Sequence, residues 1–199
     1  MLTKEKYKII RSNILSKLDS NLPKDLWYHG VHHTIDVEKE AERIAISEKI
    51  TNQEDLLLLK IACLYHDSGF LFTYNEHEAA GCDLAKKELP SFGLDQKQID
   101  TICGMIMATK IPQTPRTKLE EIICDADLDY FGREDFFPIA NTLFLELKAR
   151  SFVKSVDDWN IIQRNFFKQH RYFTGTTKKL RGKQKQRYFE MIEALVEKN

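Results

Sequence analysis

The 199-residue chain has no long hydrophobic run and no net charge, and both absences limit what it can do. No apolar stretch approaches the roughly 20 residues that span a bilayer. The N-terminal segment MLTKEKYKIIRSNILSKL lacks the apolar part of a secretion signal. Lysine plus arginine and aspartate plus glutamate both number 30, so no overall field attracts nucleic acid or an anionic membrane. We therefore expect a cytoplasmic protein with no membrane partner, for which nucleic acid is an unfavoured partner.

Cysteine is scarce, and its spacing argues against a cysteine-built zinc site. The chain has four widely separated cysteines and no CxxC pair. Each falls in or beside an apolar segment with helical spacing. They are Cys63, Cys82, Cys103 and Cys124. We expect all four to be small buried side chains in a reducing compartment.

Glycine and proline are few, 8 and 5 residues, and most lie between segments with helical apolar spacing. No segment shows a strand-like alternation that a helix does not explain as well. Thr51 or Asn52 is suited to begin one helix, and Asp95 another. The spacing predicts helices near residues 3–19, 31–47, 53–66, 76–89, 95–108, 116–131, 133–150, 156–173 and 178–197. The sequence therefore predicts one all-α domain over residues 1–199.

The segment LLLLKIACLYH (56–66) is apolar on nearly every side, which is typical of a helix at the centre of a domain. It ends in His66 and Asp67. A carboxylate at that place needs a cation or hydrogen-bond donors. Histidine and aspartate side by side offer one nitrogen and one oxygen to a metal ion. The alternative is a helix-terminal aspartate beside a core histidine that bonds a carbonyl.

A pair of histidines precedes this segment, in YHGVHHTIDV (28–37). His29 and His33 are four residues apart and share a face if one helix holds both. They would then act as two ligands, or as a ligand and a proton donor. Gly30 weakens the helix prediction for that first turn, and the alternative is a pair of surface histidines. His32 would point elsewhere, and we expect it at the surface.

Three acids alternate in LEEIICDADLDYFG (119–132). If the segment is one helix, its apolar residues define the inward face, and Asp127 falls about 40° from the centre of that face. Asp125 would lie nearly opposite, and Asp129 well to one side. Asp127 is therefore the acid that most needs a counter-charge. The alternative is an ordinary interior aspartate that caps a neighbouring helix.

Two histidines and two aspartates are thus explained together by one bound metal ion. The ion neutralises buried acids, leaves positions open to water or substrate, and lowers the pKa of bound water from about 15.7 toward 7. Mixed nitrogen and oxygen ligands are compatible with Mn, Mg, Fe, Co or Zn. The sequence leaves open whether one or two ions bind per chain.

The order H…HD…D resembles the HD superfamily of metal-dependent phosphohydrolases, and is closest in motif to the catalytic core of the cyclic-nucleotide phosphodiesterases. Their YHNxxHAxDV segment is similar to YHGVHHTIDV, their HD to His66–Asp67, and their CADL to DADL (125–128). Their ENHH and LATD correspond loosely to NEHE (75–78) and MATK (107–110). The resemblance covers residues 27–132. It implies an HD-domain fold with a metal-binding core at residues 27–132. Residues 133–199 would complete the fold and its pocket.

Carried over by position, the resemblance implies four metal ligands: His33, His66, Asp67 and Asp127. Asp67 would also bridge to a second ion, if one binds, and help to position the attacking water. His29 would be the general acid that protonates the leaving oxygen. His77 and Glu78 would lie near the site and contact substrate or orient His29, the alternative being a charged helix start.

Other segments offer weaker signals. KIPQTPRTK (110–118) predicts a stiff surface connection, or a rim where Lys110 or Arg116 meets substrate phosphates. The run KKLRGKQKQR (178–187) has six basic residues and no acid, which is typical of a solvated helix face.

Aromatic residues are concentrated in NFFKQHRYFT (165–174), at helical spacing. This pattern favours a core face. The alternative is a pocket wall for a nucleobase, with Gln169 or His170 as its polar contact.

We therefore expect a hydrolase, an HD-type phosphohydrolase or phosphodiesterase, that cleaves a phosphate ester of a nucleotide or similar small molecule with metal-activated water. One alternative is a catalytically silent, nucleotide-sensing HD domain. A less favoured one is a di-iron HD-type oxygenase. All four ligand positions are occupied by ligand residues, which favours the enzyme. Oligomeric state is not readable from the sequence.

Overall fold

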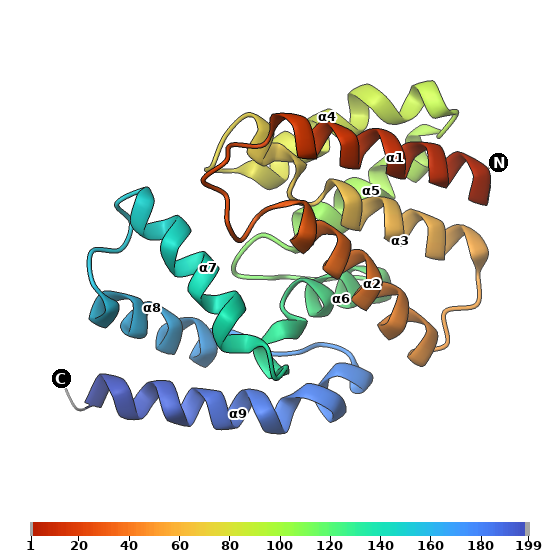
Figure 1. Ribbon diagram of the computed structural model, residues 1–199. Coiled ribbons are helices and arrows are strands. Elements are labelled where there is room, and N and C mark those ends of the chain that lie inside the picture. The colour runs from red at the N-terminus through yellow and green to blue at the C-terminus, as the bar shows by residue number, and fades with distance from the viewer. Residues whose placement is uncertain (1, 198–199) are drawn as a thin grey trace.

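A computed structural model describes residues 2–197, and within that range the chain is helical with no strand. The elements run in chain order as α1 (Lys4–Asn21), α2 (Val31–Ser47), α3 (Gln53–Tyr65), η1 (Ser68–Leu71), α4 (His77–Glu88), η2 (Leu89–Phe92), α5 (Gln96–Ala108), α6 (Lys118–Asp127), η3 (Asp129–Gly132), α7 (Phe136–Ala149), α8 (Val156–Gln169) and α9 (Gly175–Glu197). Figure 1 shows α1–α6 gathered in one region, with α7, α8 and α9 beside them. The predicted all-α fold class is confirmed.

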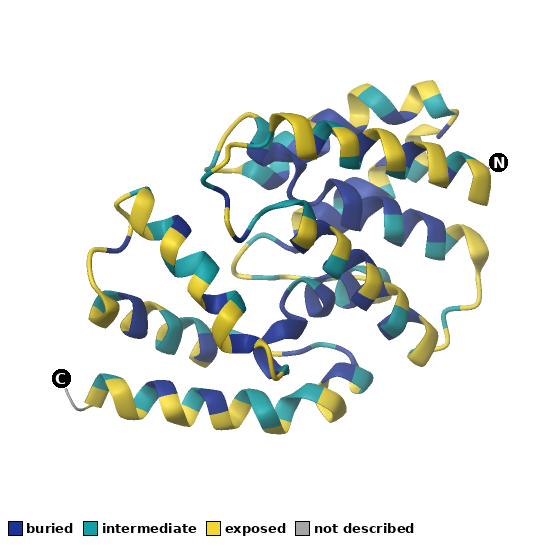
Figure 2. Ribbon diagram, in the orientation of Figure 1, coloured by how far each residue is buried: buried dark blue, intermediate teal, exposed yellow. Residues whose placement is uncertain are grey.

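The N-terminal region, α1 to α6, packs around α3. That helix carries eight buried residues between Leu57 and Tyr65, as its apolar sequence predicts. The surrounding core is mainly aliphatic, with Ile10, Ile44 and Ile102 all fully buried. Figure 2 shows α3 dark along most of its length, whereas the outer helices are buried on one side only. The rigid centre of this region is thus the helix that leads into His66 and Asp67.

The C-terminal region, α7 to α9, surrounds a second core that is mainly aromatic. Phe136 is 1% exposed and its ring stacks on Tyr188, with 4.8 Å between centroids. Phe131 stacks on Phe167 at 4.6 Å. Only three residues of α7 are buried, so this helix is much less enclosed than α3. Apolar side chains remain on its surface, including Phe137 and Leu145.

Local sequence signals explain several helix starts and one close approach. Asn52 accepts hydrogen bonds from the first backbone amides of α3, and Asp95 begins α5 with a capping box, as predicted. A Cβ atom added at Gly69 would lie 1.8 Å from the carbonyl oxygen of His77. Only glycine therefore lets η1 lie this close to the start of α4, which places His77 beside Asp67.

Two helix predictions extended four residues past the observed C-terminal end of the helix. The expected helix 116–131 ends at Asp127, because the backbone at Leu128 leaves helical geometry (φ −112°, ψ 19°) and η3 follows. The expected helix 156–173 ends at Gln169, because His170 is extended.

All four cysteines are free and buried, as predicted. No helix within residues 2–197 is long and apolar enough to cross a membrane.

Candidate metal centre

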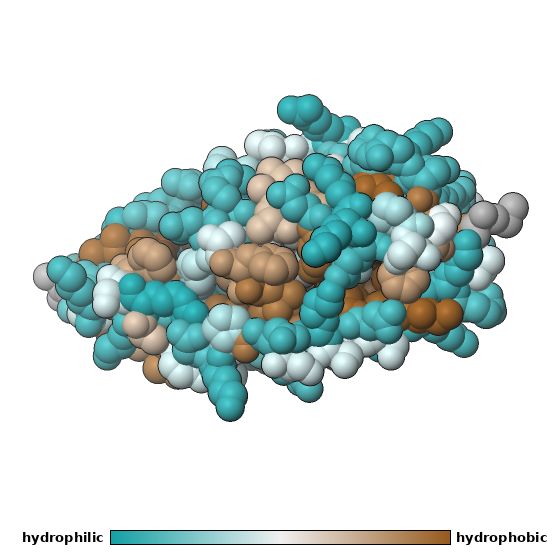
Figure 3. Space-filling model, turned by 90° about the horizontal axis from the view of Figure 1, so that it is seen from above, coloured by the Kyte–Doolittle hydropathy of each residue, from teal (hydrophilic) through white to brown (hydrophobic). Residues whose placement is uncertain are grey.

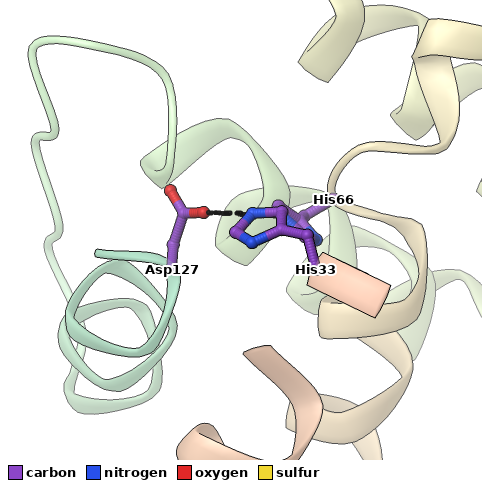
Figure 4. Close-up of side chains that lie close together, drawn as sticks. All are labelled: His33, His66 and Asp127. Carbon is purple, nitrogen blue, oxygen red and sulfur yellow. Dashed lines mark hydrogen bonds and ion pairs between the residues drawn. The ribbon is translucent and has the colours of Figure 1, made fainter. Parts of the chain in front are cut away.

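The side chains of His33, His66 and Asp127 meet between the two cores. They come from α2, from the end of α3 and from the last residue of α6. One ligand atom of each lies within 4.8 Å of the others. Figure 4 shows the Asp127 carboxylate pointing at the His33 ring, with the His66 ring beside it. The distance from His33 Nε2 to Asp127 Oδ1 is 3.1 Å.

Asp67, the fourth predicted ligand, adjoins both histidines. Its Oδ2 lies 3.1 Å from His66 Nε2 and 3.5 Å from His33 Nε2. His66 Nε2 and Asp67 Oδ2 are buried and make no hydrogen bond within the described chain. Buried polar atoms without partners are costly in a folded protein, and a cation between them would satisfy both. The donor set, two imidazoles and two carboxylates, fits a divalent metal ion.

The charges of these residues depend strongly on one another. Burial opposes a charged His66, but Asp67 and Asp127 raise its pKa well above the ordinary value. Burial likewise opposes a charged Asp127, yet hydrogen bonds from His33 and His66 lower its pKa to about 2. The pKa of Asp67 is lowered well below its usual range, against its burial, by His66. The carboxylates therefore stay ionised, ready to take a metal ion in place of the proton on a histidine.

Backbone and ring contacts orient the ligands. Nδ1 of His66 donates to the Cys63 carbonyl at 2.8 Å, which leaves Nε2 directed at the candidate centre. His77 Nε2 lies 3.4 Å from Asp67 Oδ1. The His77 ring stacks on Phe70 with 4.0 Å between centroids. His66 and His77 are thus each held by a contact outside the ligand set.

His29 lies outside α2, contrary to the expectation that His29 and His33 share one helix. Gly30 is the N-cap residue of α2, and His29 precedes it in a bend of the chain. The two rings nevertheless approach to 6.2 Å between centroids. What places His29 is Glu146 of α7, whose Oε1 accepts a hydrogen bond from His29 Nδ1 at 2.5 Å.

Glu146 is a residue that sequence reasoning missed. It is fully buried and also accepts from the backbone amide of Tyr28 and the hydroxyl of Tyr74. Burial would raise its pKa, but the bond from His29 lowers it, so the residue is a carboxylate. One signal was available: Glu146 is the single acid in the helix FFPIANTLFLELKA (136–149).

The predicted orientations of two acids were wrong. Asp125 is fully buried rather than facing outward, because the backbone amides of Phe173 and Thr174 bond its carboxylate at 2.7 and 2.8 Å. Asp129 is also fully buried and pairs with Arg43 and Arg181 at 2.9 and 2.8 Å. Both acids serve packing between distant segments, which a projection of one helix does not include. His32 is exposed, as predicted.

A cavity of about 280 Å³ opens beside the candidate centre. His29, Asp67, His77, Glu78 and Asp127 line one end of it. Residues of α7 and α8 line the other end, among them Leu143, Leu147, Trp159, Ile162, Gln163 and Phe166. Asp67 and Asp127 therefore face a space that a small molecule could occupy.

Other predicted contacts lie elsewhere. Lys110 and Arg116 do not line this cavity; Lys110 pairs with Glu76, and Arg116 is exposed. Their predicted contact with substrate phosphates has no counterpart in the cavity lining. Gln169 and His170 line a separate, smaller pocket of about 60 Å³.

The segment 165–174 contributes both to the aromatic core and to the wall of the cavity. Phe166 and Phe167 line the cavity, and Phe167 also belongs to the aromatic core. In the basic run 178–187, most side chains are exposed as predicted, whereas Arg181 turns inward to Asp129.

Residues 30–129 match the family model described as HD domain. The chain belongs to the HD domain family. The match includes all four predicted ligands, and it supports a metal-dependent phosphohydrolase at the level of the family. A search of curated proteins gave no match.

Two solved structures share the fold of this HD domain. One is described as a predicted HD superfamily hydrolase from an uncultured Thermotogales bacterium; it is 21% identical, with a TM-score of 0.59 over 96% of this chain and 91% of that one. The other, from Lactobacillus plantarum, is 18% identical, with a TM-score of 0.72 over 98% and 97% of the two chains. At these identities the likeness concerns the fold alone.

Proposed function

We propose that this HD domain hydrolyses a phosphate ester of a nucleotide or similar small molecule, with a divalent metal held by His33, His66, Asp67 and Asp127. The observation that carries the proposal is the pair of buried atoms His66 Nε2 and Asp67 Oδ2, which lie 3.1 Å apart and make no hydrogen bond within the described chain, while Asp67 also lines an open cavity. When bound, the metal supplies Lewis-acid polarisation of a phosphoryl oxygen and a lowered pKa for water.

His29 is the proposed general acid. Glu146 is ionised and can only accept, so His29 Nδ1 carries a proton and the ring presents Nε2 to a ligand in the cavity. From there the imidazolium donates its Nε2 proton to the oxygen of the departing alcohol. Proton donation of this kind contributes about 10²–10⁴-fold to a rate.

Asp67 and His77 are the groups proposed to orient the attacking water. The Oδ1 of Asp67 lies 3.4 Å from His77 Nε2, so the two present an acceptor and a donor next to each other. Burial would lower the pKa of His77, but its bond with Asp67 raises it, which favours the donor form. Glu78 adjoins His77 at 3.5 Å.

Elemental analysis of gently purified protein, followed by a phosphate-ester screen with the metal found, tests this function. We expect stoichiometric metal and release of phosphate or of a phosphomonoester. His29→Ala should retain the metal and lose turnover. Metal without any hydrolysis would favour the sensing alternative, and an iron-specific optical spectrum with oxygen consumption would favour the oxygenase.

A further inference from the structure

The cavity beside the candidate metal centre has two chemically different ends. At the metal end, histidines and carboxylates converge. At the far end, α7 contributes Leu143 and Leu147, and α8 contributes Trp159, Ile162 and Phe166. These are aliphatic and aromatic side chains, and Gln163 supplies the one carboxamide among the lining residues. A ligand that spans the cavity therefore needs a charged end and an apolar end.

Any positive charge for a phosphate would have to come from the metal end of the cavity. Neither lysine nor arginine is among the described residues that line the cavity. Cations near the lining are engaged elsewhere: Lys110 pairs with Glu76, and Arg150 pairs with Asp25 while lying over the Tyr74 ring at 4.7 Å. Lys185, 5.9 Å from the centroid of the Phe167 ring, donates a hydrogen bond to the carbonyl of His170. A second or third phosphate in the cavity would therefore lie without a counter-charge, which disfavours its binding.

The cavity volume sets the size of the apolar part. A cavity of about 150 Å³ lined by apolar side chains holds benzene, and this one measures about 280 Å³. It therefore has room for a two-ring group beside one phosphoryl group. Aromatic side chains at the far end suit a flat ring, because aromatic ring pairs attract each other beyond the burial of their area.

We propose that the site is selective for esters with a single phosphoryl group on an uncharged, largely apolar, ring-containing alcohol, and that it rejects nucleoside triphosphates and sugar phosphates. This rests on the proposed function, since the metal end must hold the phosphoryl group. Binding of the apolar part depends only on the far end of the cavity, so the two proposals are separable.

The first test compares esters of primary alcohols, whose leaving groups are similar in reactivity, on the metal-loaded protein. The series is 2-naphthylmethyl phosphate, its methyl diester, AMP, glycerol 3-phosphate and ATP. We expect kcat/KM for one of the naphthylmethyl esters to exceed that for glycerol 3-phosphate by at least about tenfold, which corresponds to burial of a few CH₂ equivalents, with no turnover of ATP. Equal or faster turnover of glycerol 3-phosphate or ATP would overturn the selectivity.

The second test measures binding without metal, so it decides the inference even if no ester is hydrolysed. Trp27→Phe leaves Trp159 as the sole tryptophan of a chain that has two. We expect a saturable change in its fluorescence on titration with 2-naphthalenemethanol. Absence of a saturable change would overturn the inference.

A matched pair of variants in that background locates the binding. Ile162 and Ile161 are neighbours on α8, 39% and 42% exposed, but only Ile162 lines the cavity. Ile162→Ala should raise the Kd for 2-naphthalenemethanol by about tenfold, and Ile161→Ala should leave it unchanged. Equal effects of the two substitutions would place the ligand outside the cavity and refute the proposal.

Discussion

The N-terminal region is built on aliphatic side chains and supplies all four candidate ligands, whereas the C-terminal region is built on aromatic ones and supplies the far wall of the cavity. α3 has eight buried residues among 13, and α7 has three among 14. Figure 3 shows apolar surface breaking through the hydrophilic exterior in the middle of one face. The closely packed N-terminal region thus fixes the positions of the candidate ligands. The more open C-terminal region provides a cavity wall whose side chains can be changed without disturbing those ligands.

The largest expected effect comes from a ligand of the N-terminal region. His33→Ala should remove the metal and lower the hydrolysis rate by more than about 10³-fold, because the ligand set loses one of two imidazoles. Metal content and phosphate release are measured together. His32→Ala is the matched control, since His32 is the adjacent, exposed residue. Retention of metal and activity by His33→Ala would remove the basis of the proposed centre.

The next largest effect is on the free energy of unfolding. It tests whether the aliphatic and aromatic cores unfold together. Phe136→Ala should cost about 3–5 kcal/mol, because it deletes a fully buried ring. Trp159 fluorescence in the Trp27→Phe background reports the aromatic region, and far-UV circular dichroism reports all helices. We expect fluorescence to change at lower urea than circular dichroism. Leu59→Ala, in the aliphatic core, should instead shift both transitions together, and coincident transitions in both variants would contradict the distinction.

Glu146 connects the two regions, because it lies on α7 and its carboxylate accepts a hydrogen bond from His29 of the N-terminal region. Glu146→Gln should lower kcat by about 10–100-fold, as for other residues that orient catalytic histidines. Metal content and KM should stay close to the original values, because the residue contacts no candidate ligand in the structure. Unchanged kcat would show that His29 needs no carboxylate partner, and loss of metal would show a purely structural role.

The smallest expected effect depends on pH. It concerns Glu48 at the C-terminal end of α2, which contacts Thr176 of α9 and Lys118 of α6. Hydrogen bonds from Lys118 and Thr176 lower the pKa of Glu48 to about 2. A folded-state pKa below the ordinary 4.5 stabilises the fold above pH 4.5, and this contribution is lost as pH falls toward 2. Glu48→Gln should therefore cost about 1 kcal/mol at pH 7 and almost nothing near pH 2. Urea unfolding at both pH values measures this, and a pH-independent difference would contradict the assignment.

Much of the helical arrangement could be predicted from short-range sequence patterns, and the three side chains of His33, His66 and Asp127 lie close together as expected. Apolar spacing identified each α-helix, and the capping residues Asn52 and Asp95 were found because their partners lie within three residues. The burial of α3 followed from its composition. The breaks after Asp127 and Gln169 were missed, because apolar residues continue beyond both helix ends while the backbone turns.

By itself, the sequence determined which residue types stand at the ends of α2, α3 and α6, and hence which side chains are able to hold a metal ion. Tertiary structure alone decided that Glu146 faces His29, that Asp125 and Asp129 are buried, and that α8 forms a cavity wall. Each of these contacts joins segments far apart in the chain. Local periodicity carries no information about which distant helix covers a given face. These contacts therefore depend on how the helices pack together.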